Sequence, residues 1–148
     1  MEGIIFIGIQ ASGKSSFYKE NFFNSHVRIS LDLLNTRNKE NQLLEKCLEL
    51  QQSVVIDNTN PTKLDRKKYI DKLKSKKYKI IGYYFQSKIV ESIKRNEDRE
   101  EKNRIPEIGI RSTYSKLELP KKLEGFDELY YVEIKDEKFK IEPWQDEI

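Results

Sequence analysis

The sequence predicts an α/β domain in which helices flank a mostly parallel sheet. Two features of the 148-residue chain indicate this fold class. Short apolar runs alternate with longer amphipathic stretches, and such alternation of strands and helices is typical of parallel sheets. A glycine-rich loop follows the first apolar run and precedes the first amphipathic stretch, as in α/β proteins that bind phosphates. We therefore expect a single domain over residues 1–148.

Five apolar runs are expected to form the strands. They cover residues 3–8, 27–30, 53–57, 78–85 and 128–134. The third run, SVVID, is continuous and rich in β-branched residues, as expected for a strand buried on both faces. A short edge strand is expected in the tail at 135–148, where Trp144 would anchor the chain.

The amphipathic stretches between these runs are expected to be helices, at residues 13–23, 37–52, 63–76, 88–102 and 108–118. The apolar pattern of the second helix predicts an inward face made of Leu43, Leu44, Cys47, Leu48 and Leu50. The pattern of the third predicts an inward face made of Leu64, Tyr69, Ile70 and Leu73.

Composition limits the classes of protein to which the chain can belong. Hydrophobic and charged residues each make up 36% of the chain, which indicates a modest core under a highly charged surface. The net charge of +3 permits an anionic partner without requiring one. The single cysteine, Cys47, excludes an internal disulfide framework and is expected to be a small buried hydrophobe. Because the apolar run at residues 3–9 is too short for a membrane span and lacks a basic flank, we expect a cytoplasmic protein with no membrane contact.

Residues 8–15, GIQASGKS, match the nucleotide-binding pattern G-x-x-x-x-G-K-[ST] at every fixed position. The glycines let the loop turn its backbone N–H groups toward phosphate oxygens, and the helix that begins near Gly13 adds its positive end. Lys14 is expected to contact the β- and γ-phosphates, and Ser15 to bind Mg²⁺. The residues expected around the nucleotide are Gly8, Gln10, Ala11, Ser12, Gly13, Lys14, Ser15 and Ser16. A chance turn is disfavoured because both flanking elements also match.

Two acidic residues follow the second and third predicted strands, at the sheet edge where ligands bind. Asp57 ends the run SVVID and resembles a Walker-B acid, so we expect it near Mg²⁺ together with Ser15. Asp32 lies beyond the second strand and could accept the proton of an attacking hydroxyl. An N-cap for the following helix is an equally good interpretation of Asp32 on spacing alone.

The segment IKRNEDREEKNR carries three arginines, Arg95, Arg99 and Arg104. Guanidinium groups on such a segment could close over a triphosphate and offset charge in the transition state. The alternative is a solvated helix face on which these arginines pair with Glu97, Asp98, Glu100 and Glu101. The charge pattern alone favours the solvated face.

The motifs GIQASGKSS, RISLDLL, SVVIDNTNPTKLDRKKYI, KRNEDR and IPEIGIRSTYSKLELPKKLEGFDELYYV occur in the order found in polynucleotide 5′-kinases. The chain most resembles the kinase domain of polynucleotide kinase-phosphatases, over about residues 4–132. The stretch VVIDNTNPT is the most specific, although D-x-T-N also occurs in related small-molecule kinases. The resemblance implies an adenylate-kinase-like P-loop NTPase fold with a charged lid at about 95–107, and ATP and Mg²⁺ as cofactors.

The resemblance also implies roles for individual residues. Lys14 would act in catalysis, Asp32 would be the general base on a 5′-hydroxyl, and Arg95 and Arg99 would be lid arginines, with Arg104 as the alternative to Arg99. Asp57, Thr59, Asn60 and Ile105 would line the acceptor side. Phage-type enzymes carry an acceptor-binding arginine where this chain has Asn35, with Arg37 two residues further on, so we assign both positions to the substrate.

The leading hypothesis is an ATP-dependent polynucleotide 5′-kinase that phosphorylates DNA or RNA ends. The phosphatase signature D-x-D-G-T is missing from the sequence, so a separate phosphatase or ligase would complete end repair. The basic stretch at 63–77, with Lys121 and Lys122, could attract a nucleic acid, although a solvated face is the more common role of such a stretch. A kinase of a small molecule is the alternative function. A regulatory nucleotide-binding module is disfavoured because it needs neither a base nor a lid.

Overall fold

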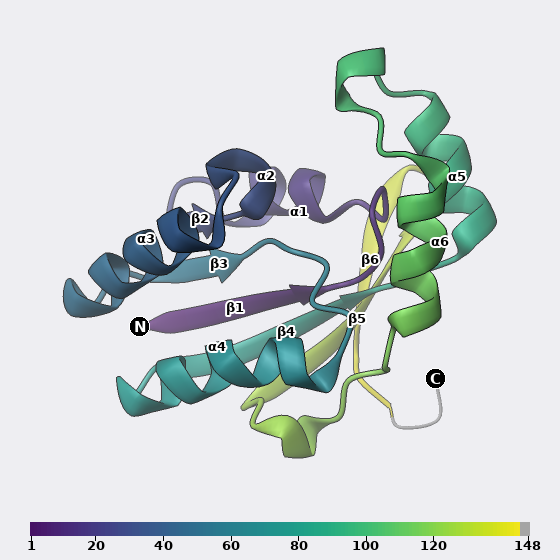
Figure 1. Ribbon diagram of the computed structural model, residues 1–148. Coiled ribbons are helices and arrows are strands. Elements are labelled where there is room, and N and C mark those ends of the chain that lie inside the picture. The colour runs from purple at the N-terminus through teal and green to yellow at the C-terminus, as the bar shows by residue number, and fades with distance from the viewer. Residues whose placement is uncertain (146–148) are drawn as a thin grey trace.

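The computed structural model describes residues 1–145, which contain a six-stranded sheet of order β2-β3-β1-β4-β5-β6 (Figure 1). Its strands are β1 (Glu2–Ile7), β2 (Val27–Ile29), β3 (Val54–Ile56), β4 (Lys79–Phe85), β5 (Glu128–Lys135) and β6 (Lys138–Pro143). The first five strands are parallel, whereas β6 pairs antiparallel with β5 at the edge. The predicted α/β class and the edge strand are confirmed, and residues 146–148 of the predicted tail lie outside the described part.

All five predicted helices are present: α1 (Lys14–Asn21), α3 (Arg37–Glu49), α4 (Lys63–Ser75), α5 (Ile89–Glu97) and α6 (Glu107–Lys116). Two of these helices begin at an N-cap residue that the sequence supplies locally. In α3 the Thr36 side chain accepts from the Lys39 N–H, and in α4 Thr62 forms a capping box with Asp65. The short helix α2 (Leu31–Leu34) was not predicted, nor were the 3₁₀ turns η1 (Glu101–Asn103) and η2 (Lys122–Glu124).

Helix α5 ends at Glu97, five residues before the predicted end at 102. The chain folds back there because the Asn96 side chain bonds both backbone groups of Ile105. Its Nδ2 donates to the Ile105 carbonyl at 2.6 Å, and its Oδ1 accepts from the Ile105 N–H at 2.8 Å. The charged segment 98–104, which contains η1, is therefore a connection that protrudes between α5 and α6, at the top of the view in Figure 1.

The core forms on both faces of the sheet, because side chains of β1 alternate between them. Ile5 and Ile7 pack in one cluster with α3 and α4, whereas Ile4 and Phe6 pack in the other with α1. Cys47 is buried in the first cluster, as predicted. No helix within residues 1–145 combines the length and apolar character needed to cross a membrane.

Two leucines predicted to face inward are exposed instead. Leu50 is 67% exposed because it lies just beyond the last residue of α3, Glu49. Leu64 is 78% exposed, whereas Leu73 on the same helix is fully buried. Nine residues at about 100° per residue place Leu64 on the side of α4 opposite Leu73. The predicted anchor is confirmed, since Trp144 packs edge-on against Tyr84 with ring centroids 5.3 Å apart.

Candidate active site

A cavity of about 280 Å³ opens at the carboxyl ends of β1 and β3. The phosphate loop, the start of α1 and the start of α2 line it. Segment 57–61 after β3 also lines it, together with Asp65 and Lys68 of α4. Arg37 of α3 lines it as well, and Arg99 and Ile105, from the segment predicted as a lid, complete the lining. This is the sheet edge at which the motifs predicted the ligand.

The phosphate loop has the backbone shape that its glycines allow. Gly13 has φ +100°, lies directly before α1, and packs so closely that a Cβ there would come within 3.0 Å of Ile134 and Phe139. Gly8 anchors the start of the loop, since its N–H donates to the Thr59 carbonyl at 3.0 Å. The loop therefore sits between the segment after β3 and the β5–β6 hairpin.

Lys14 is the buried cation of the loop. Its Nζ donates to the carbonyls of Gly8 at 2.9 Å and Ile9 at 2.7 Å. Burial lowers its pKa to about 8, partly offset by the negative charges of Asp57 and Asp32. The positive charge of Arg99 lowers the same pKa further. The charges of Asp57, Asp32 and Arg99 are thus close enough to Lys14 to affect its ionisation.

Ser15 and Asp57 meet where a metal ion was predicted. The Ser15 hydroxyl donates to Asp57 Oδ2 at 3.2 Å, and the Asp57 side chain is 2% exposed. A hydroxyl and a carboxylate are the hard oxygen ligands that Mg²⁺ prefers, and this ion commonly takes its other ligands from phosphates and water, so the pair fits magnesium. No cluster of three or more His, Cys, Asp or Glu suited to a metal occurs among residues 1–145.

Arg28, on β2, contacts both members of this pair. Its Nε donates to Asp57 Oδ2 at 2.8 Å, and its Nη2 donates to Ser15 Oγ at 3.0 Å. The register of β2 on β3 brings Arg28 opposite Val55, two residues before Asp57. A guanidinium cation therefore neutralises the buried carboxylate in this structure.

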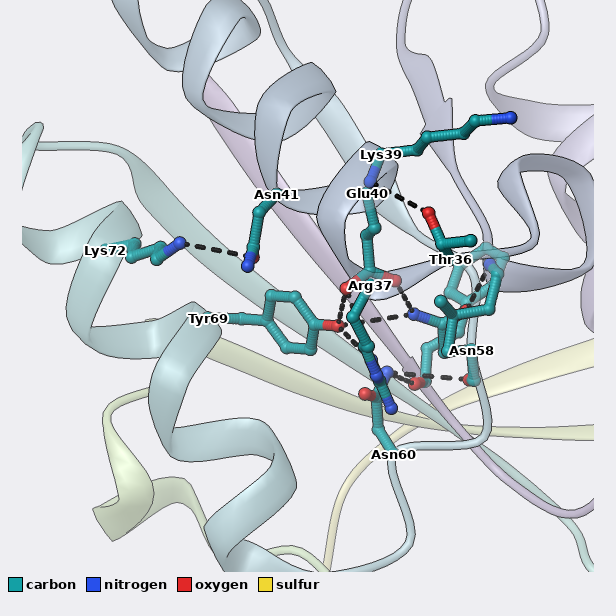
Figure 2. A network of polar contacts seen from close by, with 11 residues as sticks. Thr36, Arg37, Lys39, Glu40, Asn41, Asn58, Asn60, Tyr69 and Lys72 are labelled. Atoms are coloured by element: carbon teal, nitrogen blue, oxygen red, sulfur yellow. Dashed lines mark hydrogen bonds and ion pairs between the residues drawn. The ribbon is translucent and has the colours of Figure 1, made fainter.

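Asp32 lies in the first turn of α2, is exposed, and lines the cavity. Its interpretation as an N-cap is wrong, because Ser30 is the N-cap of α2 and Thr36 that of α3. The backbone before Asp32 is held from outside the helix, since the Leu31 N–H donates to Asn58 Oδ1 at 2.9 Å. Asn58 in turn belongs to a buried polar network with Glu40 and Tyr69 (Figure 2).

The three arginines of the segment predicted as a lid have different surroundings. Arg95 donates to the Ala11 carbonyl at 3.2 Å and pairs with Glu91, whereas Arg99 reaches the cavity itself. Arg104 is exposed and donates to the Arg99 carbonyl, away from the cavity lining. In the part of the chain described, neither Arg99 nor Arg104 forms an ion pair, so the predicted pairing with neighbouring acids is not observed.

Other predicted site residues divide between the cavity and its supports. Gln10, Ala11, Ser16, Thr59, Ile105 and Arg37 line the cavity. Asn60 lines the cavity too, but its buried amide donates to the Phe6 carbonyl at 2.7 Å. This bond fixes segment 57–61 to β1. Gly8 and Ser12 lie outside the lining, as does Asn35, which ends α2 with φ +72°.

Comparisons of sequence find relatives of this chain. No protein-family model matches the chain. Over 140 residues, 90% of its length, it is 30% identical to the bifunctional polynucleotide phosphatase/kinase of Schizosaccharomyces pombe. Over 78 residues, 52% of its length, it is 40% identical to a protein of Acanthamoeba polyphaga mimivirus described in similar terms. The chain spans 34% and 18% of the lengths of these two relatives.

Solved structures share the fold. A gluconokinase from Sinorhizobium meliloti aligns with a TM-score of 0.60 at 17% identity, over 89% of this chain and 82% of its own. Kti12 from Chaetomium thermophilum, solved with ADP-AlF3, aligns with a TM-score of 0.64 at 15% identity, over 90% of both chains. The chain resembles polynucleotide phosphatase/kinases in sequence and P-loop kinases in fold. The family resemblance expected from the motifs is confirmed.

Several residues in or near this site were not singled out from the sequence. Arg28 contacts Asp57, which lies 29 positions away, so its role carries no local signal. Glu40 pairs with Arg37 three positions away, but its contact with Asn58 spans 18 positions and could not be read from the sequence. Lys68 was part of a basic stretch, but only the packing of α4 shows that it lines the cavity. Asp65 could have been found from its capping box with Thr62.

Proposed function

We propose that this kinase transfers the γ-phosphate of ATP to the 5′-hydroxyl of a DNA or RNA end. The observation that supports this most directly is the convergence of Lys14, Asp32 and Arg99 on one cavity. A lysine for phosphates, a carboxylate for a hydroxyl proton and a lid arginine are the groups that phosphoryl transfer needs.

In the proposed mechanism, backbone N–H groups of the loop and Lys14 bind the phosphates of ATP. Ser15 and Asp57 would hold Mg²⁺, which would neutralise charge on the phosphates. Asp32 accepts the proton of the 5′-hydroxyl as its oxygen forms a bond to the γ-phosphorus. The bond from that phosphorus to the bridging oxygen breaks, ADP leaves, and Arg99 offsets charge on the transferring group.

The acceptor side of the cavity favours an anionic substrate. Arg37 and Lys68 both line it, and Lys68 has a lowered pKa because of partial burial and the neighbouring charge of Arg37. Two adjacent cations suit the phosphodiester of a nucleic acid, and Ile105 offers an apolar surface for a base. A small-molecule acceptor is the second candidate, because about 280 Å³ is close to the lower limit for a small-ligand site.

The test is transfer of labelled γ-phosphate from ATP with Mg²⁺ to oligonucleotides of graded length that carry a 5′-hydroxyl. The matched control is the same oligonucleotide with a 5′-phosphate already in place. We expect label only on the hydroxyl ends, with acceptor affinity that falls as salt rises. Label on nucleosides or metabolites but on no oligonucleotide would replace this proposal by the small-molecule kinase.

The depressed pKa of Lys14 predicts that ATP affinity depends on pH. Bound phosphates favour the charged lysine, so above the free pKa of about 8 binding must take up a proton. We expect ATP affinity to fall by up to about tenfold per pH unit above pH 8, measured by calorimetry. In Lys14→Arg the guanidinium stays charged, so its affinity should not change with pH over this range.

The same pKa shift has a consequence for stability. Between about pH 8 and the ordinary lysine value of 10.5, the unfolded chain binds more protons than the folded one. The free energy of unfolding should therefore rise with pH across this window in the wild type relative to Lys14→Arg. An ATP affinity that is flat from pH 7 to 10 would contradict the assignment of Lys14.

Arg28 should oppose metal binding, because its cation lies on the two side chains assigned to Mg²⁺. We expect Arg28→Gln to bind Mn²⁺ about tenfold more tightly in the presence of ADP, as measured by electron paramagnetic resonance. Arg111→Gln, which removes an exposed arginine on α6, is the matched control. Equal Mn²⁺ affinity in both variants would show that Arg28 does not compete with the metal.

A further inference from the structure

Glu40 is a fully buried acid in the first turn of α3, outside the cavity lining. Figure 2 shows it at the centre of a network that joins three segments of the chain. Its carboxylate accepts from the Tyr69 hydroxyl at 2.5 Å, from Asn58 Nδ2 at 2.8 Å and from Arg37 Nη1 at 3.2 Å. A buried carboxylate is costly unless such donors satisfy it.

The directions of these hydrogen bonds are set by the donors. Burial, followed by the hydrogen bond to Glu40, raises the pKa of Tyr69, so its hydroxyl keeps its proton and donates to Glu40. The amide of Asn58 must then present its Nδ2 to Glu40 and its Oδ1 away from it. Glu40 therefore decides which way the Asn58 amide faces.

The orientation of Asn58 matters because its Oδ1 accepts from the Leu31 N–H at 2.9 Å. Leu31 directly precedes Asp32 and opens α2, a helix of only four residues. The N-cap residue of α2 is Ser30, but its hydroxyl makes no hydrogen bond to the N–H groups of the first turn. Asn58 thus supplies the partner that the first N–H of α2 lacks.

The second branch of the network leads to the acceptor side. Arg37 Nη1 contacts both Glu40 and the Tyr69 hydroxyl, the latter at 3.1 Å. One edge of the guanidinium is thereby fixed, while the side chain remains 55% exposed and lines the cavity. A guanidinium held in this way loses less entropy when it binds a phosphate.

We propose that Glu40 is a positioning residue for phosphoryl transfer: through Asn58 it holds the backbone of Asp32, and through Arg37 it orients the acceptor-binding guanidinium. The inference rests on the roles proposed above for Asp32 and Arg37. The competing role is purely structural, a buried link between α3 and α4. A control variant can distinguish the positioning role from the structural one, because α4 forms a second buried link to another segment that lies outside the cavity lining.

That comparable link is the ion pair between Arg66 and Glu124. Arg66 is fully buried, and its Nε and Nη2 donate to the two carboxylate oxygens of Glu124 at 2.8 and 3.1 Å. Neither residue lines the cavity. Glu124→Gln is therefore the matched control for Glu40→Gln, because both variants neutralise a carboxylate paired with α4.

Glu40→Gln keeps the shape of the side chain but replaces one acceptor oxygen by an N–H₂ group, which is a donor. If this N–H₂ group faces Asn58 Nδ2, two amide donors meet. If the Asn58 amide turns over to avoid this, its Nδ2 faces the Leu31 N–H. In both of these arrangements the hydrogen bond to Leu31 weakens. If the N–H₂ group faces Tyr69 and Arg37 instead, it meets the Arg37 donor and disturbs the branch that orients this guanidinium. Amide hydrogen exchange at Leu31, measured by NMR, is a direct readout that requires no substrate.

We expect exchange at Leu31 to accelerate about tenfold or more in Glu40→Gln, with kcat lowered about 10- to 100-fold and the KM for ATP within about twofold. Glu124→Gln should lower the melting temperature yet leave Leu31 exchange and kcat unchanged. Tyr69→Phe removes one donor without adding another, so it should give the same pattern in milder form if Glu40→Gln does not fold.

Unchanged Leu31 exchange and kcat in Glu40→Gln would overturn the inference, as would equal effects of Glu124→Gln. Failure of the proposed function has a different signature, namely a wild-type protein that phosphorylates no 5′-hydroxyl end. In that case Leu31 exchange still decides whether Glu40 positions the start of α2.

Discussion

Replacing Asp32 by Asn should lower kcat by about 10²- to 10⁴-fold while leaving ATP affinity nearly unchanged. The amide preserves the shape of the side chain but cannot accept the proton of the attacking hydroxyl. Asp32 lines the cavity from α2 rather than from the phosphate loop. Single-turnover transfer of labelled γ-phosphate measures the chemical step, and calorimetry with ATP measures binding.

Asp71→Asn is the matched control for this variant, because Asp71 is an exposed acid on α4 that pairs with Lys67. It should retain wild-type turnover. Normal turnover of Asp32→Asn would exclude Asp32 as the general base, and with it the proposed mechanism. If no acceptor is phosphorylated by the wild type although ATP binds, the regulatory nucleotide-binding module becomes the better interpretation.

Replacing Arg66 by Met should lower the free energy of unfolding by about 3–5 kcal/mol. The Arg66 guanidinium pairs with Glu124 and donates from Nη1 to the carbonyls of Asn60, Pro61 and Glu118 at 3.0–3.2 Å. The variant loses all of these bonds and leaves the Glu124 carboxylate, 11% exposed, without its partner. Urea denaturation followed by circular dichroism measures the loss, which corresponds to a fall of roughly 10 °C in melting temperature.

The double variant Arg66→Met with Glu124→Leu separates the two contributions. Because no unpaired charge remains, it should recover part of the lost stability. A loss below about 1 kcal/mol in the single variant would mean that water replaces the guanidinium at little cost. Arg66 was predicted as part of a basic surface, but it is an interior residue that joins α4 to the segments around η2 and the cavity.

Features with local causes were predicted well from the sequence. The phosphate loop is a contiguous pattern whose glycines, lysine and serine have set roles, so its position between β1 and α1 could be read directly. The strands and the five main helices followed from apolar periodicity. Two of the errors lie at helix ends: Leu50 lies beyond α3, and α5 ends early because Asn96 bonds Ile105, nine residues further on. A third is the four-residue helix α2, which was not predicted.

The sequence by itself determined that this chain has a nucleotide loop, a doubly flanked parallel sheet and acids at the edge of that sheet. Only the tertiary structure decided which partners those acids have. Asp57 meets Arg28 through the register of β2 on β3, Glu40 meets Tyr69 through the packing of α3 beside α4, and Arg66 meets Glu124 across 58 residues. Periodicity indicates which side of an element is buried, but the partner of a buried charge depends on how elements distant in the chain pack together.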